Sequence, residues 1–192
     1  MAYIDVEDLR AYLGISETTD DDLLTEAVED AQSYIESQTN RRFEANTETR
    51  YFGRASRDPH NRTILHLDTD LISVTTLTNG DSSGTEITSA NYWLLPRNEG
   101  PPYHQIQLKT NISSYWEWDT DYWVSVLGSW GYSSTPPGDI VRACTALAGY
   151  FYRQKDAQMY DVTAVVESGA MVIPQGIPAT VTRILDRYKR YI

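Results

Sequence analysis

Two stretches with helical spacing of apolar residues flank a long stretch with strand spacing, and this switch limits what the chain can fold into. Residues 21–38 place Leu24, Ala27, Val28, Ala31, Tyr34 and Ile35 at a repeat of about 3.6 residues, which predicts an amphipathic helix. A second helix, apolar over a wide arc, is predicted after Pro136 and Pro137. Between the two, residues 47–132 hold short alternating segments separated by Gly, Asn and Pro, which is typical of an antiparallel β unit.

Shorter elements are predicted at both ends of the chain. Residues 5–13 form a short helix that stops at Gly14, and residues 177–192 form a last helix with Val181, Ile184, Leu185 and Tyr188 on one face. The intervening residues 162–173 suit a hairpin or an extended arm. The prediction is an α+β protein, a small helical bundle with an inserted antiparallel β unit and a C-terminal arm plus helix. Its domains are 1–46 with 133–192, and 47–132.

Charge is concentrated near the N-terminus. The chain has 192 residues, with 16 basic against 27 acidic side chains and a net charge of −11. Eleven of the acids and a single base fall within the first 40 residues. Such a segment repels phosphate, which argues against nucleic-acid binding there, although a merely solvated helix face remains the alternative. The apolar content of 41% excludes a wholly disordered chain.

The residues for catalysis or metal binding are sparse. The three histidines, His60, His66 and His104, lack metal-ligand spacing, and Cys144 falls in an apolar helix. Glycine-rich phosphate loops and membrane-length apolar runs do not occur in the sequence. The pairs Asp68 with Asp70 and Asp119 with Asp121 suit turns, or alternatively calcium or sugar chemistry. We therefore expect no enzyme activity, no cofactor, no metal and no membrane partner.

Aromatic residues are unusual in kind, with 14 Tyr and 5 Trp against 3 Phe. Four of the five Trp residues and three of the Tyr residues lie within residues 115–132. Three interpretations stay open: the core of the β unit, a protein–protein interface, or a stacking platform for sugar rings. The candidates for an interface are Trp116, Trp118, Tyr122, Trp123 and Trp130.

The C-terminus is basic and aromatic. Arg183, Arg187 and Arg190 are spaced to line one stripe of a helix, and Tyr188 and Tyr191 are neighbours on another. A solvated helix end is one interpretation, and a docking strip for an acidic partner is the other.

Several stretches resemble the head–tail connector proteins of long-tailed bacteriophages, also called adaptor or head-completion proteins. The resemblance covers the helical parts of the chain. It rests on Asp8–Leu13, Asp21–Leu24, Tyr34–Phe43, Pro136–Ile140, Tyr152-Arg153, Ile177-Pro178 and Tyr188–Arg190.

The resemblance implies a structural virion protein. Twelve copies would form a ring that joins the portal to the next neck or tail-completion protein and extends the DNA channel. The site would be the head–tail junction of the virion, reached after assembly in host cytoplasm. The alternative function is a carbohydrate-binding or sugar-processing module.

The resemblance also suggests roles for two charged segments. It implies that the C-terminal arm and helix dock on the portal, with candidates Arg183, Arg187, Tyr188, Lys189, Arg190 and Tyr191. DNA that passes through a channel must not stick, so acidic side chains are expected along its wall. The candidates for that lining are Asp20, Asp21, Asp22, Glu26, Glu29 and Asp30.

Overall fold

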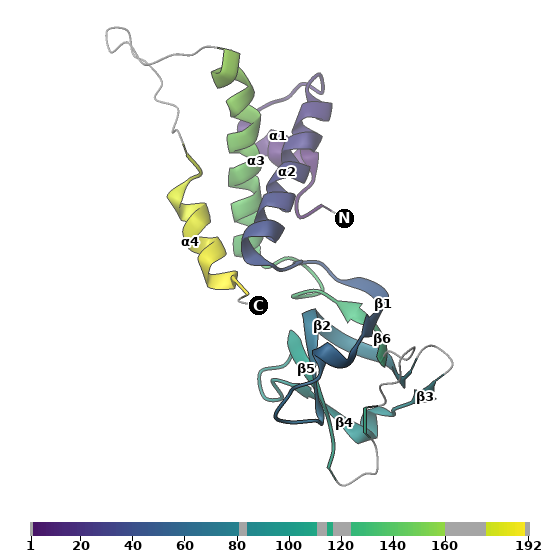
Figure 1. Cartoon of the computed structure of the whole chain (residues 1–192). Coiled ribbons are helices and arrows are strands. Elements are labelled where there is room, and N and C mark those ends of the chain that lie inside the picture. The colour runs from purple at the N-terminus through teal and green to yellow at the C-terminus, as the bar shows by residue number, and fades with distance from the viewer. Residues whose placement is uncertain (1, 81–83, 111–114, 117–123, 160–175, 191–192) are drawn as a thin grey trace. The chain divides into compact units, whose positions relative to one another are not determined.

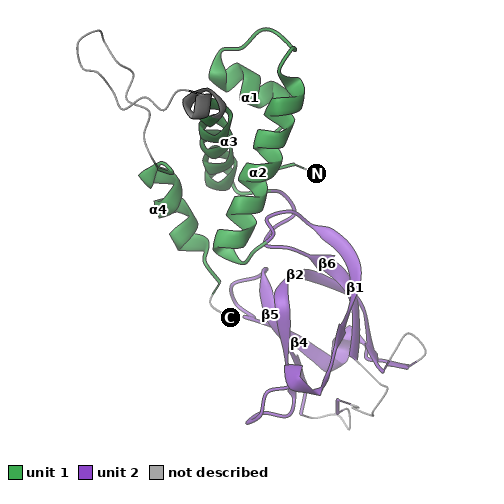
Figure 2. Ribbon diagram, turned by 45° about the horizontal axis from the view of Figure 1, so that its top comes forward, with its two compact units in different colours: residues 1–41, 136–192 green, residues 42–135 purple. Residues whose placement is uncertain are grey.

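The computed structural model describes residues 2–80, 84–110, 115–116, 124–159 and 176–190. Within them the chain divides into two compact units, residues 1–41 with 136–192 and residues 42–135 (Figure 2). The first unit is helical and the second is an antiparallel sheet, so the predicted α+β class is confirmed.

The first unit contains the helices α1 (Val6–Leu13), α2 (Asp21–Thr39), α3 (Gly138–Met159) and α4 (Ala179–Tyr188). Figure 1 shows α3 lying between α2 and α4. The apolar stripe of α2 is buried, as its spacing predicts, and α3 is buried along Ile140, Ala143, Cys144, Leu147 and Ala148. The apolar arc of α3 is wide because the other three helices all pack against it.

The last helix is shorter than predicted. It ends at Tyr188 instead of running to Ile192, because Lys189 takes an extended conformation with ψ 128°. Arg190 therefore lies beyond the helix, and its predicted place on one helical stripe with Arg183 and Arg187 is wrong. The other helix ends follow the sequence more closely, since Gly14 and Asn40 both take the left-handed conformation that stops a helix.

The second unit is a sheet with strand order β1-β6-β2-β5-β4, and β3 pairs with β2. Its strands are β1 (Asn46–Phe52), β2 (Ile64–Asn79), β3 (Thr85–Glu86), β4 (Tyr92–Leu95), β5 (Tyr103–Leu108) and β6 (Val124–Trp130). The pair Asp68 and Asp70 suits a turn in the sequence, but both residues lie inside the single long strand β2. Irregular register after His66 and again after Leu71 lets β2 pair first with β5 and then with β6.

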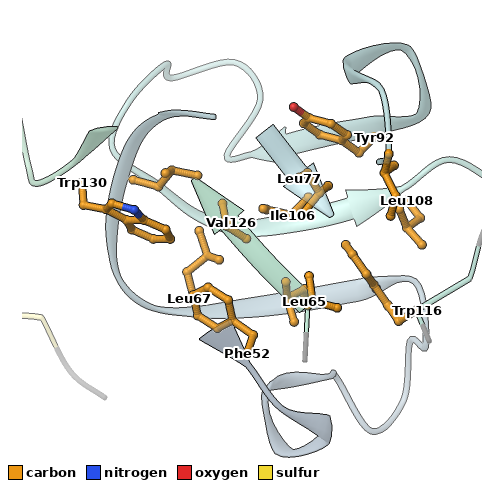
Figure 3. Close-up of a cluster of buried hydrophobic side chains, with 13 residues drawn as sticks. Phe52, Leu65, Leu67, Leu77, Tyr92, Ile106, Leu108, Trp116, Val126 and Trp130 are labelled. Carbon is orange, nitrogen blue, oxygen red and sulfur yellow. The ribbon is translucent and has the colours of Figure 1, made fainter. Parts of the chain in front are cut away.

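A cluster of buried apolar side chains fills the inner side of this sheet (Figure 3). Alternate residues of β5 and β6 supply much of it, as with Val124, Val126 and Trp130 of β6, and β1 contributes Phe52. Arg50 of β1 lies 5.1 Å from the ring centre of Trp130 and binds the carboxylates of Glu48 and Asp68. A cation–π contact and two ion pairs thus hold the β1 side chain against the core.

Gly128 of β6 gives a test of this packing. A Cβ atom there would lie 2.4 Å from the backbone oxygen of Ser73 on β2. We expect Gly128→Ala to lower the free energy of unfolding by about 1–3 kcal/mol, because the two strands must move apart. Denaturant unfolding followed by tryptophan fluorescence measures the change. The control is Gly138→Ala, where a Cβ atom meets nothing within 4 Å. Equal losses in the two variants would contradict the packing.

Candidate assembly surfaces

The acidic residues of the N-terminal helices separate into two groups. Asp22, Glu26, Glu29 and Asp30 are exposed on the side of α2 opposite its buried stripe. Their spacing of three and four residues places them on one face, and none of the four makes an ion pair or hydrogen bond within the described residues. We call these four residues the acidic stripe.

Asp20 and Asp21 belong to the helical packing instead. Asp20 accepts a hydrogen bond of 2.5 Å from the hydroxyl of Tyr152 on α3. Asp21 lies 3.4 Å from the guanidinium of Arg10 on α1. Both carboxylates are half-buried, so they hold neighbouring helices together. Four of the six predicted channel-lining residues are therefore free to meet solvent or a partner, and two are engaged inside the unit.

The C-terminal residues are largely held by their own unit. Asp139, at the start of α3, accepts hydrogen bonds from the Arg187 guanidinium at 2.9 Å and from the Tyr188 hydroxyl at 2.7 Å. Beyond the helix, the Arg190 backbone N–H donates to the Thr39 carbonyl at 2.9 Å. The end of α4 is thus fastened to both α2 and α3.

The remaining predicted docking residues differ in their exposure and in their ion pairs. Arg183 is exposed, and Lys189 pairs with Asp186 at 2.7 Å. Arg187 keeps an exposed side chain despite its ion pair. Tyr191 and the predicted arm at 162–173 lie outside the described residues. The outward surface of α4 therefore offers Arg183 and Arg187, while Tyr188 is turned to the bundle.

Two of the predicted interface aromatics are core residues. Trp116 and Trp130 are 4% and 2% exposed, and their indole N–H groups donate to the carbonyls of Thr63 and Glu48. Neither is open to a partner or a sugar ring, because the β unit uses them to fill its interior. Trp118, Tyr122 and Trp123 lie outside the described residues.

The loop that joins β1 to β2 forms a basic surface that was not predicted from the sequence. The arginine loop, residues 53–63, carries Arg54, Arg57 and Arg62 with one acid, Asp58. Arg54 and Arg62 are exposed and Arg57 is half-buried, and none of the three pairs with a carboxylate among the described residues. Three arginines within nine positions of an acidic chain were the available signal. The predictions of charged surfaces concerned only the two ends of the chain, the acidic N-terminus and the basic C-terminus.

Asp58 fixes the shape of this loop. One carboxylate oxygen accepts the backbone N–H groups of His60 and Asn61, at 2.8 and 2.7 Å. The other lies 2.9 Å from the Nε2 atom of His66 on β2. The hydrogen bond from His66, followed by those from the two backbone N–H groups, lowers the pKa of Asp58 to about 2. The loop is therefore preorganised while this carboxylate is ionised.

Chemistry at the other candidate residues is limited. Burial raises the pKa of Cys144 to about 12, which keeps its thiol protonated and unreactive. Asp68 binds Arg50, whereas Asp70 is buried beside His104 at 3.2 Å, so the two carboxylates of that pair are engaged separately. No group of three metal-ligating side chains occurs among the described residues. None of the helices in that part is long and apolar enough to cross a membrane.

Comparison with known protein families identifies the family of this chain. Residues 2–191 match the family described as head completion protein, which is nearly the whole chain and both of its units. The chain belongs to the head completion protein family. Membership gives it a structural role in completing the head of a phage-like particle. No significant match was found among curated proteins.

Solved structures with a similar fold come from gene transfer agent particles. The chain is 20% identical, with a TM-score of 0.61, to a chain in "Neck of empty GTA particle computed with C6 symmetry", covering 99% of this chain and 91% of that one. A chain in "Virion of native gene transfer agent (GTA) particle" is 17% identical, with a TM-score of 0.63 and the same coverage. A third, in "Neck of native GTA particle computed with C12 symmetry", is 18% identical, with a TM-score of 0.57, covering 97% and 88%. The head completion fold therefore extends over both units.

The Asp58 carboxylate predicts an acid sensitivity of the β unit. Its pKa of about 2 lies below the ordinary value of 3.8, so its contribution to stability is full above pH 4 and disappears as pH falls through 2. We expect the wild type to be more stable than Asp58→Asn at pH 5 and the difference to shrink towards pH 2. Denaturation midpoints measured across this range test the expectation. A difference independent of pH would contradict it.

The contacts of Asp139 predict how firmly α4 is held. Tyr188→Phe removes one hydrogen bond to that carboxylate, and we expect a loss of about 1 kcal/mol in the stability of the helical unit. Backbone hydrogen exchange over residues 181–188 should become several-fold faster. Arg183→Ala is the control, because that side chain is exposed on the same helix and makes no ion pair among the described residues. Equal exchange in wild type and Tyr188→Phe would show that the tether is unimportant.

Proposed function

We propose that the chain forms a closed ring at the head–tail junction of a phage-like virion, where it joins the portal to the next neck or tail-completion protein and extends the DNA channel. The observation that carries this proposal is the match of residues 2–191 to the head completion protein family. The similarity to chains of gene transfer agent necks supports it, because both units of this chain find counterparts there.

Twelve copies are the proposed number. Two of the similar neck structures were computed with sixfold and twelvefold symmetry, and a ring of twelve is compatible with both. A closed ring repeats one head-to-tail contact, which requires two different and complementary patches on each chain. Assembly would take place in host cytoplasm before the protein enters the virion.

The outward surface of α4 is the proposed contact with the portal. Arg183 and Arg187 are exposed there, and arginine is a frequent anchor in protein interfaces. The inner surface of α4 stays fastened to Asp139, so the helix would dock as a fixed element. Lys189, Arg190 and Tyr191 follow it directly in sequence and would extend the contact.

DNA is proposed to pass through the ring without being bound. The net charge of −11 opposes counterion-release binding, which depends on clusters of basic side chains. The role is therefore proposed to be structural, with no bond made or broken by the protein. The carbohydrate-binding alternative gains no support from Trp116 and Trp130, whose rings are buried.

Electron microscopy of the purified chain, alone and mixed with the portal protein from the same genome, tests the ring. We expect rings with a central opening and twelvefold averages, seated on the portal in the mixture. Portal protein without the chain provides the control. Persistent monomers in the presence of the portal would contradict the proposed function, as would normal joining of tails to heads after deletion of the gene.

A further inference from the structure

The four carboxylates of the acidic stripe have no basic partner within the described residues of a single chain. Asp22, Glu26 and Asp30 follow one another at intervals of four residues, and Glu29 lies beside them. Like charges at this spacing weaken a helix. No basic side chain among the described residues pairs with any of the four. A basic partner surface would remove this repulsion and leave α2 otherwise unchanged.

Whereas the acidic stripe carries negative charge, the arginine loop carries positive charge that its own carboxylate does not neutralise. Its single carboxylate, Asp58, is already occupied by His66 and by the backbone N–H groups of His60 and Asn61. The positive charges of Arg54, Arg57 and Arg62 are therefore not neutralised within the loop. Because the loop backbone is fixed, little conformational entropy would be lost on binding.

We propose that the arginine loop of one copy binds the acidic stripe of the next copy in the ring. This inference rests on the proposed function, since it names the contact by which copies assemble. A head-to-tail contact joins two different patches of the same chain. The stripe and the loop are such patches, because they belong to different units and carry opposite charge. The stripe spans about 12 Å of helix, from the rise of about 1.5 Å per residue, so it offers several carboxylates to forked guanidinium groups.

An apolar residue lies beside the stripe and strengthens the case for a protein partner. Leu23 is 43% exposed and neighbours Asp22 and Glu26 on α2. Charge pairs mainly orient and steer two surfaces, while apolar contact contributes the burial that keeps them together. In this arrangement the stripe lies between copies, and it does not face the channel.

Charge reversal of each surface tests the contact. The first variant is Glu26→Lys/Glu29→Lys/Asp30→Lys, which reverses the charge of the stripe from −4 to +2. The second is Arg54→Glu/Arg62→Glu, which reverses the charge of the loop from +2 to −2. Each alone should lose ring formation at least tenfold, measured as the assembled fraction in analytical ultracentrifugation. The wild-type rings should also dissociate as salt is raised. Circular dichroism and thermal unfolding establish that both variants fold.

Mixing the two variants gives the decisive measurement. In an equimolar mixture, reversed stripes meet reversed loops and native stripes meet native loops, so rings with alternating copies should form. A chain carrying all five substitutions should also assemble alone. The control is Asp8→Lys/Glu17→Lys/Glu99→Lys, which changes the net charge as much as the stripe variant does, at exposed acids outside the stripe, and should leave assembly unchanged.

The other outcomes overturn the inference in distinguishable ways. Normal rings from the stripe variant alone would show that the stripe faces something other than the next copy, such as the channel. Assembly of the chain with all five substitutions, without rescue in the mixture, would show that loop and stripe pair within one chain. If the wild type forms no rings, the proposed function fails. The contact is then judged separately by whether the two variants associate with each other in the ultracentrifuge, and absence of association overturns it.

Discussion

The packing of α3 against the three other helices is the interaction on which the helical unit depends. Ile140, Cys144 and Leu147 of α3 are fully buried, and α1, α2 and α4 each contact this helix. This single apolar element determines which side of α2 is buried and therefore which side carries the acidic stripe. It also determines where Asp139 stands to hold the end of α4. Both candidate surfaces of the unit thus depend on one buried helix.

Periodicity in the sequence was sufficient for the main elements. The helical repeat of α2 predicted its buried side, and the short alternating segments between the two long helices predicted an antiparallel sheet. Local patterns failed where long-range contacts decide the outcome. Asp68 and Asp70 suit a turn by residue type, but β2 continues through them because β5 and β6 pair with its two halves. The end of α4 was misplaced because Lys189 and Arg190 are good helix formers, yet Arg190 donates its backbone N–H to α2.

Only part of the candidate surfaces was predicted, because local patterns in the sequence do not show which side chains are engaged by distant residues. Composition revealed that acids and aromatics were abundant, but only the structure shows which of them are engaged. Asp20 and Asp21 resemble their neighbours in sequence and differ in having Tyr152 and Arg10 as partners. Trp116 and Trp130 differ from exposed aromatics in having carbonyl acceptors that satisfy the indole N–H within the core. The three arginines of the loop can be counted in the sequence, but only the structure shows that the carboxylate of Asp58 is engaged by His66 and two backbone N–H groups.

The helical unit takes its helices from both ends of the chain, with the whole β unit between them. During synthesis, α1 and α2 leave the ribosome long before α3, so they can contact each other but lack their contacts with α3 until about a hundred further residues have followed. The β unit, by contrast, is continuous and is complete before α3 emerges. A truncated product would therefore lack any finished helical bundle. The acidic stripe of α2 therefore becomes part of a folded bundle only in molecules that contain α3, whereas the arginine loop belongs to the unit that is complete earlier.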